Sequence, residues 1–224
     1  MDAIVAFLDQ YAGLLAGGTW DTIVMTGLAT FFAYVLGVPI GVAVVLTSPV
    51  GLHPHRVFNS VLGWIVNMGR SIPFIILLVA LIPFTRFIVG TALGVPGAIV
   101  PLVVAAAPFV GRMVEQSLTE VDGGLIEAAQ SVGASTMQIV TKVFLLESLP
   151  SLIRGASITF ITLFGYAAMA GMVGAGGLGD IAIRYGYMRF QGDVMLAAVL
   201  ICIILVQIIQ SIGDLLARKI DKRN

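Results

Sequence analysis

Three places in this sequence hold residues whose type and position suggest a chemical role. Arg70 sits within a long apolar stretch, His53 and His55 flank a proline, and Glu127 begins a Glu-Ala-Ala motif in a polar segment. An intramembrane enzyme would need several His, Asp, Glu or Ser side chains together at depth in the bilayer. Arg70 is the single ionisable candidate at such depth. The sequence therefore predicts no catalytic residue.

Arg70 allows two interpretations. A charge inside a membrane is costly, so such a residue usually faces a water-filled cavity or pairs with a carboxylate. In that case Arg70 would line a path through the bilayer. Alternatively, the membrane span is shifted to residues 72–89, and Arg70 extends its side chain to the cytoplasmic edge. The shifted span would bury Arg86, so we favour the first interpretation.

The histidines and the single cysteine are expected to be structural. No carboxylate or cysteine lies near His53 and His55 to complete the ligand set of a metal site. We expect these histidines to form a cytoplasmic turn and the chain to bind no metal. Cys202 lies inside an apolar stretch and has no second cysteine to pair with, so we expect it to serve in packing.

Composition places the chain in a lipid bilayer. Its 224 residues are 58% hydrophobic and 11% charged, and the mean hydropathy is +1.04, unlike the values of soluble domains. A helix needs about 20 apolar residues to cross the hydrocarbon. Five stretches qualify, at residues 23–46, 61–82, 95–114, 155–173 and 194–212. We predict an all-α membrane protein with five transmembrane helices in a single domain of residues 1–224.

The first predicted span and the residues before it have two further features. Residues 3–15 are apolar but interrupted by Asp9 and Gln10, so they form either an interfacial helix or a frayed tail. Gly37 and Gly41 are small residues four apart, a spacing that allows another helix to approach closely. We expect this pair to be a helix-packing site.

The distribution of Lys and Arg predicts the orientation. With five spans the termini lie on opposite sides of the membrane, and cytoplasmic loops carry an excess of positive charge. The basic residues on the C-terminal side are Arg56, Lys142, Arg154, Arg218, Lys219, Lys222 and Arg223. The other side holds Arg86, Arg184 and Arg189. We expect the C-terminus and the polar segment 115–150 in the cytoplasm, and the N-terminus outside.

The polar segment 115–150 is predicted to contain two short helices joined at a glycine. Helix-forming residues run over 125–132 and again over 136–146, on either side of Gly133. Glycine adopts the left-handed backbone conformation that ends one helix and redirects the next, which other residues adopt only at a cost. We call residues 125–146 the elbow. At the junction between the third predicted span and this segment, Arg112 and Glu115 are three residues apart on one helix face. They should form a local ion pair.

The fourth predicted span presents one polar face. Gly155, Thr159, Thr162, Tyr166 and Met169 follow at intervals of four, three, four and three, so they share one side of a helix. This row of hydroxyl side chains ends in the thioether of Met169, and such a row suits a path for a small, partly apolar solute. Thr and Gly are also favoured where transmembrane helices pack, so packing is the alternative.

Two segments after this span are expected at the outer surface. Residues 171–180 contain five glycines in nine residues, too many for a stable helix interior, and should form a close-packed turn. Residues 184–193 mix Arg with Tyr and Phe, a composition found at protein interfaces and equally in the aromatic belt of a membrane protein.

Over its whole length the chain resembles the methionine-uptake permeases of bacterial ABC importers. The segments that carry this resemblance are residues 66–74 (Val-Asn-Met-Gly-Arg-Ser-Ile-Pro-Phe), the EAA motif from Glu127 to Gly133, and residues 165–179. The resemblance implies the type I ABC importer permease fold, with the elbow as the cytoplasmic EAA coupling loop between spans three and four. The broader motif ends in a proline where this chain has Leu146, which leaves the end of the second elbow helix open.

The resemblance also implies partners. The permease would be a homodimer in the bacterial inner membrane, bound to two cytoplasmic ABC ATPase subunits and supplied by an outer substrate-binding protein. ATP and Mg would be bound by the ATPase, so this chain would hold no cofactor, and no nucleic acid is expected. Methionine, in D- or L-form, and its analogues would cross by alternating access. Another amino acid is the main alternative, and a passive channel or an intramembrane enzyme is a weaker one.

On this basis two groups of residues are expected to function. The residues expected to contact the ATPase are Glu127, Ala128, Ala129, Gly133 and Ala134. The residues expected to line the translocation path are Thr159, Thr162, Tyr166, Met169 and Arg70.

Overall fold

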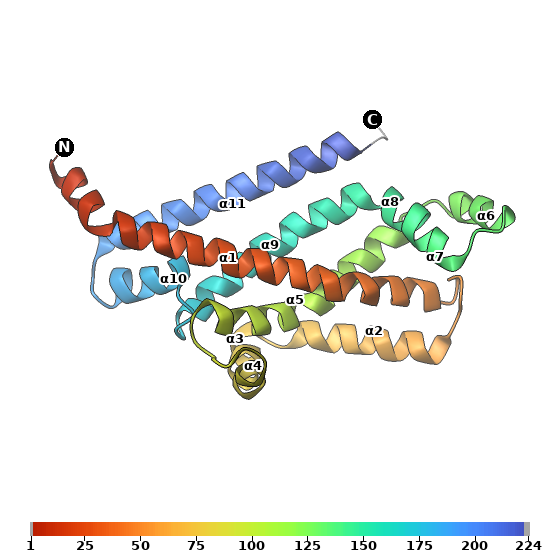
Figure 1. Cartoon of the computed structure of the whole chain (residues 1–224), viewed down its shortest axis with the longest axis horizontal. Coiled ribbons are helices and arrows are strands. Elements are labelled where there is room, and N and C mark those ends of the chain that lie inside the picture. Colours follow the sequence, from red (N-terminus) through yellow and green to blue (C-terminus); the bar gives the residue numbers. More distant parts are fainter. Residues whose placement is uncertain (1, 222–224) are drawn as a thin grey trace. The chain divides into compact units, whose positions relative to one another are not determined.

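The regular secondary structure is helical in the part of the chain that its computed structural model describes, residues 2–221, with side chains described from residue 5 onward (Figure 1). Lys222 and Arg223, two of the basic residues used to predict orientation, lie outside the described residues. The chain packs as two compact units, each assembled from three separate stretches. Unit 1 holds the residues up to Phe31, Pro73–Val104 and Phe160–Ile209, and unit 2 holds Phe32–Ile72, Ala105–Thr159 and the residues from Gln210 onward.

Among the residues that the structure describes, four helices are long and apolar enough to cross a membrane. They are α1 (Asp2–Thr47), α5 (Gly94–Thr119), α9 (Leu149–Gly171) and α11 (Gly192–Ile220). The predicted spans 23–46, 95–114 and 194–212 lie inside α1, α5 and α11, and the span 155–173 overshoots the end of α9 by two residues. The length of the apolar stretches therefore predicts the presence of these four helices.

The second predicted span is wrong as one continuous helix. Residues 61–82 are divided between α2 (Arg56–Ser71) and α3 (Phe74–Ala80), whose axes meet at 100°. The break falls at Ile72, which is extended with ψ 123°, because the ring of Pro73 disfavours the helical conformation in the residue before it. The alternative span 72–89 is not continuous either, since Leu81 separates α3 from α4 (Ile82–Val89). Counting the bent pair as one span gives five candidates.

The N-terminal segment 3–15 is neither a separate helix nor a frayed tail. It is the first part of α1, which continues without interruption to Thr47. Asp9 and Gln10 are exposed on the helix surface, so they do not break it. Leu15, by contrast, is buried in the core of unit 1.

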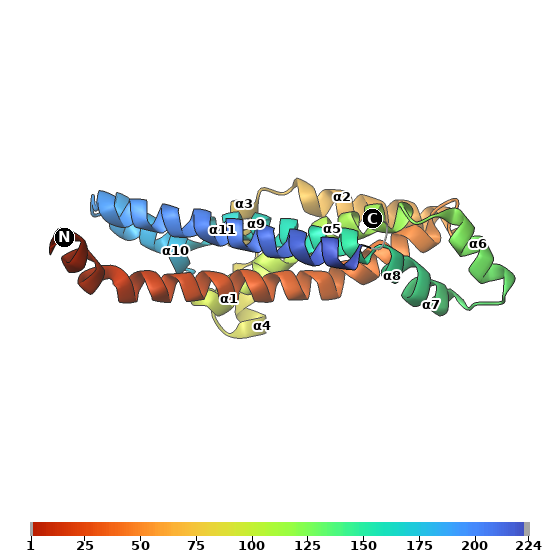
Figure 2. The same ribbon diagram turned by 90° about the horizontal axis from the view of Figure 1, so that it is seen from above.

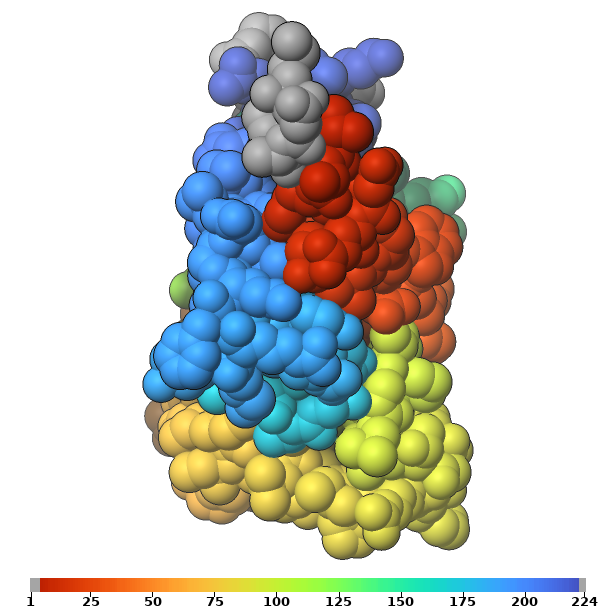
Figure 3. Space-filling model, turned by 90° about the vertical axis from the view of Figure 1, so that its left-hand side faces the viewer, coloured from red at the N-terminus to blue at the C-terminus, as the bar shows by residue number. Residues whose placement is uncertain are grey.

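The core of unit 1 joins the first part of α1 to α9, to residues 178–181 and to the start of α11. Figure 3 shows the start of α1 lying against the segments near residues 180–200. Its buried residues are Leu15, Phe164, Leu178, Ile181, Val194 and Ala198.

The glycine-rich segment after α9 is a close-packed turn, as predicted, and its last glycines begin a short helix, α10 (Gly177–Ile181). Gly174, Gly176 and Gly177 have positive φ. The backbone N–H of Leu178 donates to the hydroxyl of Thr22 in α1 at 2.9 Å. The turn is followed by a π-helix, η2 (Ala182–Tyr187).

In unit 2, the predicted packing role of Gly37 and Gly41 is confirmed. A Cβ on Gly37 would lie 2.6 Å from Val110 in α5, and one on Gly41 would lie 2.7 Å from the carbonyl oxygen of Gly111. Real Cβ atoms do not approach other atoms so closely. The two glycines therefore let α1 and α5 come into backbone contact.

Candidate functional site

The elbow has a helix, a glycine and a second helix in the predicted order. The first helix, α6 (Gly123–Ser131), begins after Asp122, whose carboxylate accepts from the N–H of Gly124 at 2.6 Å. It ends at Val132, and Gly133 follows with φ +78°. No side chain or backbone atom lies within 4 Å of the position a Cβ on Gly133 would take. The glycine is therefore required by backbone conformation and not by crowding.

The second elbow helix starts with a capping box. The hydroxyl of Ser135 accepts from the N–H of Gln138 at 3.3 Å, and the Gln138 side chain accepts from the N–H of Ser135 at 2.8 Å. This satisfies two N–H groups that a helix start leaves unpaired and fixes the beginning of α7 (Thr136–Ile139).

The chain then continues through a π-helix, η1 (Val140–Phe144), into α8 (Leu145–Glu147). Leu146, which stands where the broader motif has proline, lies in α8, and the helix ends one residue later with Ser148 as its C-cap. Figures 1 and 2 both show α6 and α7 projecting beyond the ends of α5 and α9 that they connect.

The expected ATPase-contact residues are mostly accessible. Glu127, Ala128 and Gly133 are exposed, and Ala129 and Ala134 are half-buried. Sequence reasoning missed three apolar side chains on the same segment. Val132 is 84% exposed, Met137 70% and Leu146 58%. Apolar side chains in a polar segment were the available signal, and several of them exposed together indicate a contact surface.

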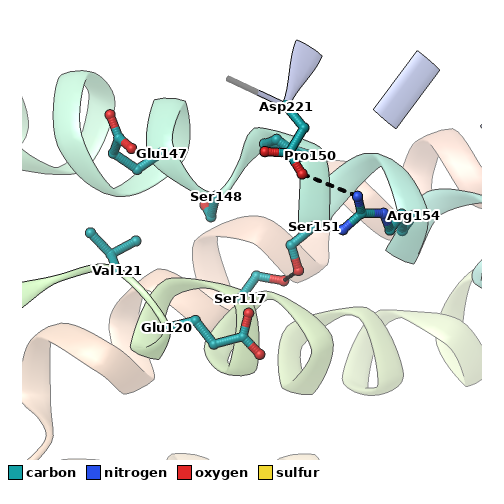
Figure 4. A pocket seen from close by; sticks show the side chains of 9 residues that line it. All are labelled: Ser117, Glu120, Val121, Glu147, Ser148, Pro150, Ser151, Arg154 and Asp221. Carbon is teal, nitrogen blue, oxygen red and sulfur yellow. Dashed lines mark hydrogen bonds and ion pairs between the residues drawn. The ribbon is translucent and has the colours of Figure 1, made fainter. Parts of the chain in front are cut away.

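The base of the elbow is held by polar contacts between α5, α9 and the end of α11 (Figure 4). The hydroxyls of Ser117 and Ser151 are 2.7 Å apart, and Arg154 pairs with Asp221 at 3.2 Å. These residues line a polar cavity of about 80 Å³. The local ion pair predicted between Arg112 and Glu115 is confirmed at 2.6 Å.

The predicted path residues on α9 differ in their surroundings. Thr159 is fully buried, and its hydroxyl donates to the carbonyl of Gly155 at 2.8 Å. Met113 of α5 lies beside it, with its sulfur 3.9 Å from the hydroxyl. Thr159 thus has the environment of a packing residue in this chain.

The C-terminal part of the same face is more open. Thr162 and Tyr166 are half-buried, and Met169 is 46% exposed. The ring of Tyr166 stacks on that of Phe74, with centroids 4.7 Å apart and planes 3° from parallel. Phe74 is the first residue of α3, so Tyr166 packs directly after the break that separates α3 from α2.

Arg70 is exposed and lies in the last turn of α2, where a cation is stabilised by the helix dipole. Its guanidinium carbon is 6.0 Å from the ring centroid of Phe109. Within residues 5–221 no carboxylate forms an ion pair with it. Within unit 2, no recorded contact joins Arg70 to Thr159.

The two histidines have protein partners. Nε2 of His53 lies 2.8 Å from the hydroxyl of Thr136, and Nδ1 of His55 accepts from the N–H of Phe58 at 3.1 Å. His55 thereby caps the start of α2. In the described part of the chain, no group of three metal-ligating side chains comes together.

Curated relatives match 70% or more of the chain. The chain is 50% identical over 210 residues to a protein of Vibrio cholerae named probable D-methionine transport system permease protein MetI, covering 94% of this chain and 93% of that one. It is 53% identical over 158 residues to the D-methionine transport system permease protein MetI of Escherichia coli K12, covering 70% and 73%.

Solved structures agree. A structure described as inward-facing conformations of the MetNI methionine ABC transporter matches with a TM-score of 0.93 and 49% identity, covering 95% of this chain and 99% of that one. A structure of an amino acid ABC transporter with histidines shares the fold at a TM-score of 0.76 and 18% identity. A family model described as binding-protein-dependent transport system inner membrane component matches residues 37–224. The chain therefore belongs to the family of inner membrane components of binding-protein-dependent transport systems.

Proposed function

We propose that this chain is the permease subunit of an ATP-driven importer that carries methionine across the inner membrane. The observation that carries the proposal is the identity of about half of all positions, over 94% of the chain, with a relative named as a D-methionine transport permease. The similarity to the MetNI transporter structure supports the same substrate. The proposed assembly is a homodimer with two cytoplasmic ATPase subunits and an outer substrate-binding protein. In this assembly the ATPase subunits hold ATP and Mg, and this chain has no catalytic role.

Transport requires a cavity that opens alternately to the two sides. A methionine zwitterion that entered hydrocarbon alone would have to shed its hydration without compensation. ATP binding closes the ATPase pair, and the elbow of each subunit passes that movement to the membrane helices, so that two states are coupled by different contacts. In this proposal the chain has five spans, an outer N-terminus and a cytoplasmic elbow and C-terminus.

Within the elbow, Glu127 is the proposed charged contact with the ATPase, and its exposure supports this role. Ala128 and Ala129 carry small side chains that permit close approach. Gly133 sets the angle between the elbow helices. The exposed Val132 and Met137 supply the apolar part of the contact.

ATP hydrolysis by the reconstituted complex tests the proposal. The chain, its ATPase and its binding protein are combined in nanodiscs, and ATP hydrolysis is measured with binding protein loaded with each of a panel of amino acids. Methionine-loaded binding protein is expected to stimulate hydrolysis severalfold over the empty protein. Stimulation by another amino acid, without stimulation by methionine, would assign a different cargo.

Cysteine scanning tests the path. Cys202 is the only cysteine, so Cys202→Ser gives a cysteine-free background. We expect cysteines at Tyr166 and Met169 to react with a water-soluble thiol reagent, and a cysteine at the fully buried Thr159 to be protected. Methionine should slow the reaction at the first two positions. Equal protection at all three would assign this face of α9 to helix packing.

A further inference from the structure

Residues 48–55, which connect α1 to α2, form an ordered loop. The N–H of Gly51 donates to the carbonyl of Ser48 at 2.9 Å, with Pro49 at the second position of the turn. The N–H of His53 donates to the carbonyl of Leu46 at 2.9 Å. A Cβ on Gly51 would overlap the carbonyl oxygens of the preceding helix end, so the turn lies directly on α1. The loop therefore presents its side chains in a fixed arrangement.

The most exposed apolar side chain among those the structure describes is at the tip of this turn. Val50 is 97% exposed. The backbone hydrogen bonds that hold the turn leave its isopropyl group pointing away from the protein's own core. A single exposed valine needs no explanation. Its place in a loop that contacts the elbow through His53 does.

The loop is attached to the elbow. Nε2 of His53 lies 2.8 Å from the hydroxyl of Thr136, although the two residues are 83 positions apart. Thr136 is the first residue of α7, three positions after Gly133 and one before Met137. Both the loop and the elbow belong to unit 2. The loop is thus held next to α7, the elbow helix that carries the exposed Met137.

We propose that residues 48–55 form a second contact with the ATPase beside the elbow, with Val50 as the apolar contact and His53 as the residue that positions the loop. This inference rests on the proposed function, and it extends the docking surface beyond the EAA segment.

Charge favours a protein partner over the lipid surface. The acidic residues of segment 115–150 are Glu115, Glu120, Asp122, Glu127 and Glu147, against the single basic residue Lys142. A cytoplasmic membrane surface is negatively charged and attracts basic segments, so this acidic region is not drawn to it. Residues 48–55 themselves hold no Lys, Arg, Asp or Glu, with Arg56 following as the first residue of α2, and His53 ties them to this acidic segment.

Photo-crosslinking tests the contact. In the Cys202→Ser background, Val50→Cys is labelled with benzophenone maleimide, and the permease–ATPase complex is irradiated in nanodiscs. An adduct with the mass of permease plus ATPase is expected. Val132→Cys serves as the positive comparator on the elbow. Phe190→Cys is the negative comparator, because Phe190 is 92% exposed but lies on the side expected to face outward.

The outcomes separate this inference from the proposed function. The second contact is overturned if Val132→Cys forms ATPase adducts but Val50→Cys forms only lipid adducts or none. The elbow's role would then remain intact. Absence of ATPase adducts from both positions contradicts docking through the elbow itself, and with it the proposed function.

The role of His53 is tested by the yield of the Val50→Cys adduct. His53→Ala and Thr136→Val should each lower the yield about threefold or more, as expected for the loss of one hydrogen bond. Thr136→Ser keeps the hydroxyl, so the yield of the Val50→Cys adduct should stay near that of the protein with Thr136. Thr141→Val is the matched control, because the Thr141 hydroxyl donates to the carbonyl of Met137, four residues earlier in the elbow, at 2.7 Å and not to the loop. Unchanged yields in both His53→Ala and Thr136→Val would show that His53 does not position the loop.

Discussion

Gly133→Val is expected to abolish methionine uptake, lowering it by about tenfold or more, while the protein still enters the membrane. Gly133 has φ +78°, a conformation that costs a residue with a Cβ about 1–2 kcal/mol. A β-branched side chain is among the least suited to it. One or two kcal/mol changes a conformational equilibrium by a factor of about 5 to 30. Because nothing crowds the position, the variant can relieve the strain by rearranging the turn, and that rearrangement misplaces α7.

Uptake of labelled methionine into proteoliposomes containing the whole complex measures the effect, with the amount of permease in the membrane fraction as the normalisation. Gly133→Asn is the matched control, since asparagine tolerates the left-handed conformation better than other residues with a Cβ. It should retain most of the activity. Wild-type uptake by Gly133→Val would show that the angle between α6 and α7 does not matter for transport.

Local rules predicted the elbow and the long helices but not the bend after α2. Apolar content is similar on both sides of Ile72, so hydropathy over residues 61–82 predicts one continuous span. Pro73 was the signal that a helix stops there. The partner of the residue after the break was not predicted: Phe74, the first residue of α3, is buried and stacks on Tyr166. Such contacts between distant residues cannot be obtained from composition.

The same distinction applies to the candidate site. Gly133 and the capping box at Ser135 depend on neighbours within a few residues, and their conformations follow from residue type. Thr159 and Met169 both lie in α9, as predicted, but helical periodicity cannot tell that α5 covers Thr159 through Met113. The contact between His53 and Thr136 joins segments that have no sequence relation. It appears only when α1, α2 and the elbow are assembled.

Gly179→Val is expected to cause a large loss of stability. Gly179 lies in α10, and a Cβ there would overlap the backbone of Ala168 in α9, within unit 1. Overpacking usually costs about 1–3 kcal/mol, and here a side-chain rotation cannot relieve it because the obstructing atoms are backbone. The apparent melting temperature of the purified permease in detergent should fall by about 5 °C or more.

Gly192→Val is the matched control for this substitution. It introduces the same side chain at the start of α11, where nothing lies within 4 Å of the added Cβ. Its melting temperature should stay within a degree or two of wild type, and a similar fall in both variants would mean that the contact between Gly179 and Ala168 is not the cause. The melting temperature also distinguishes Gly179 from Gly133. Both valine variants should lose uptake, but strain at Gly133 is confined to an exposed turn, so only Gly179→Val should melt early.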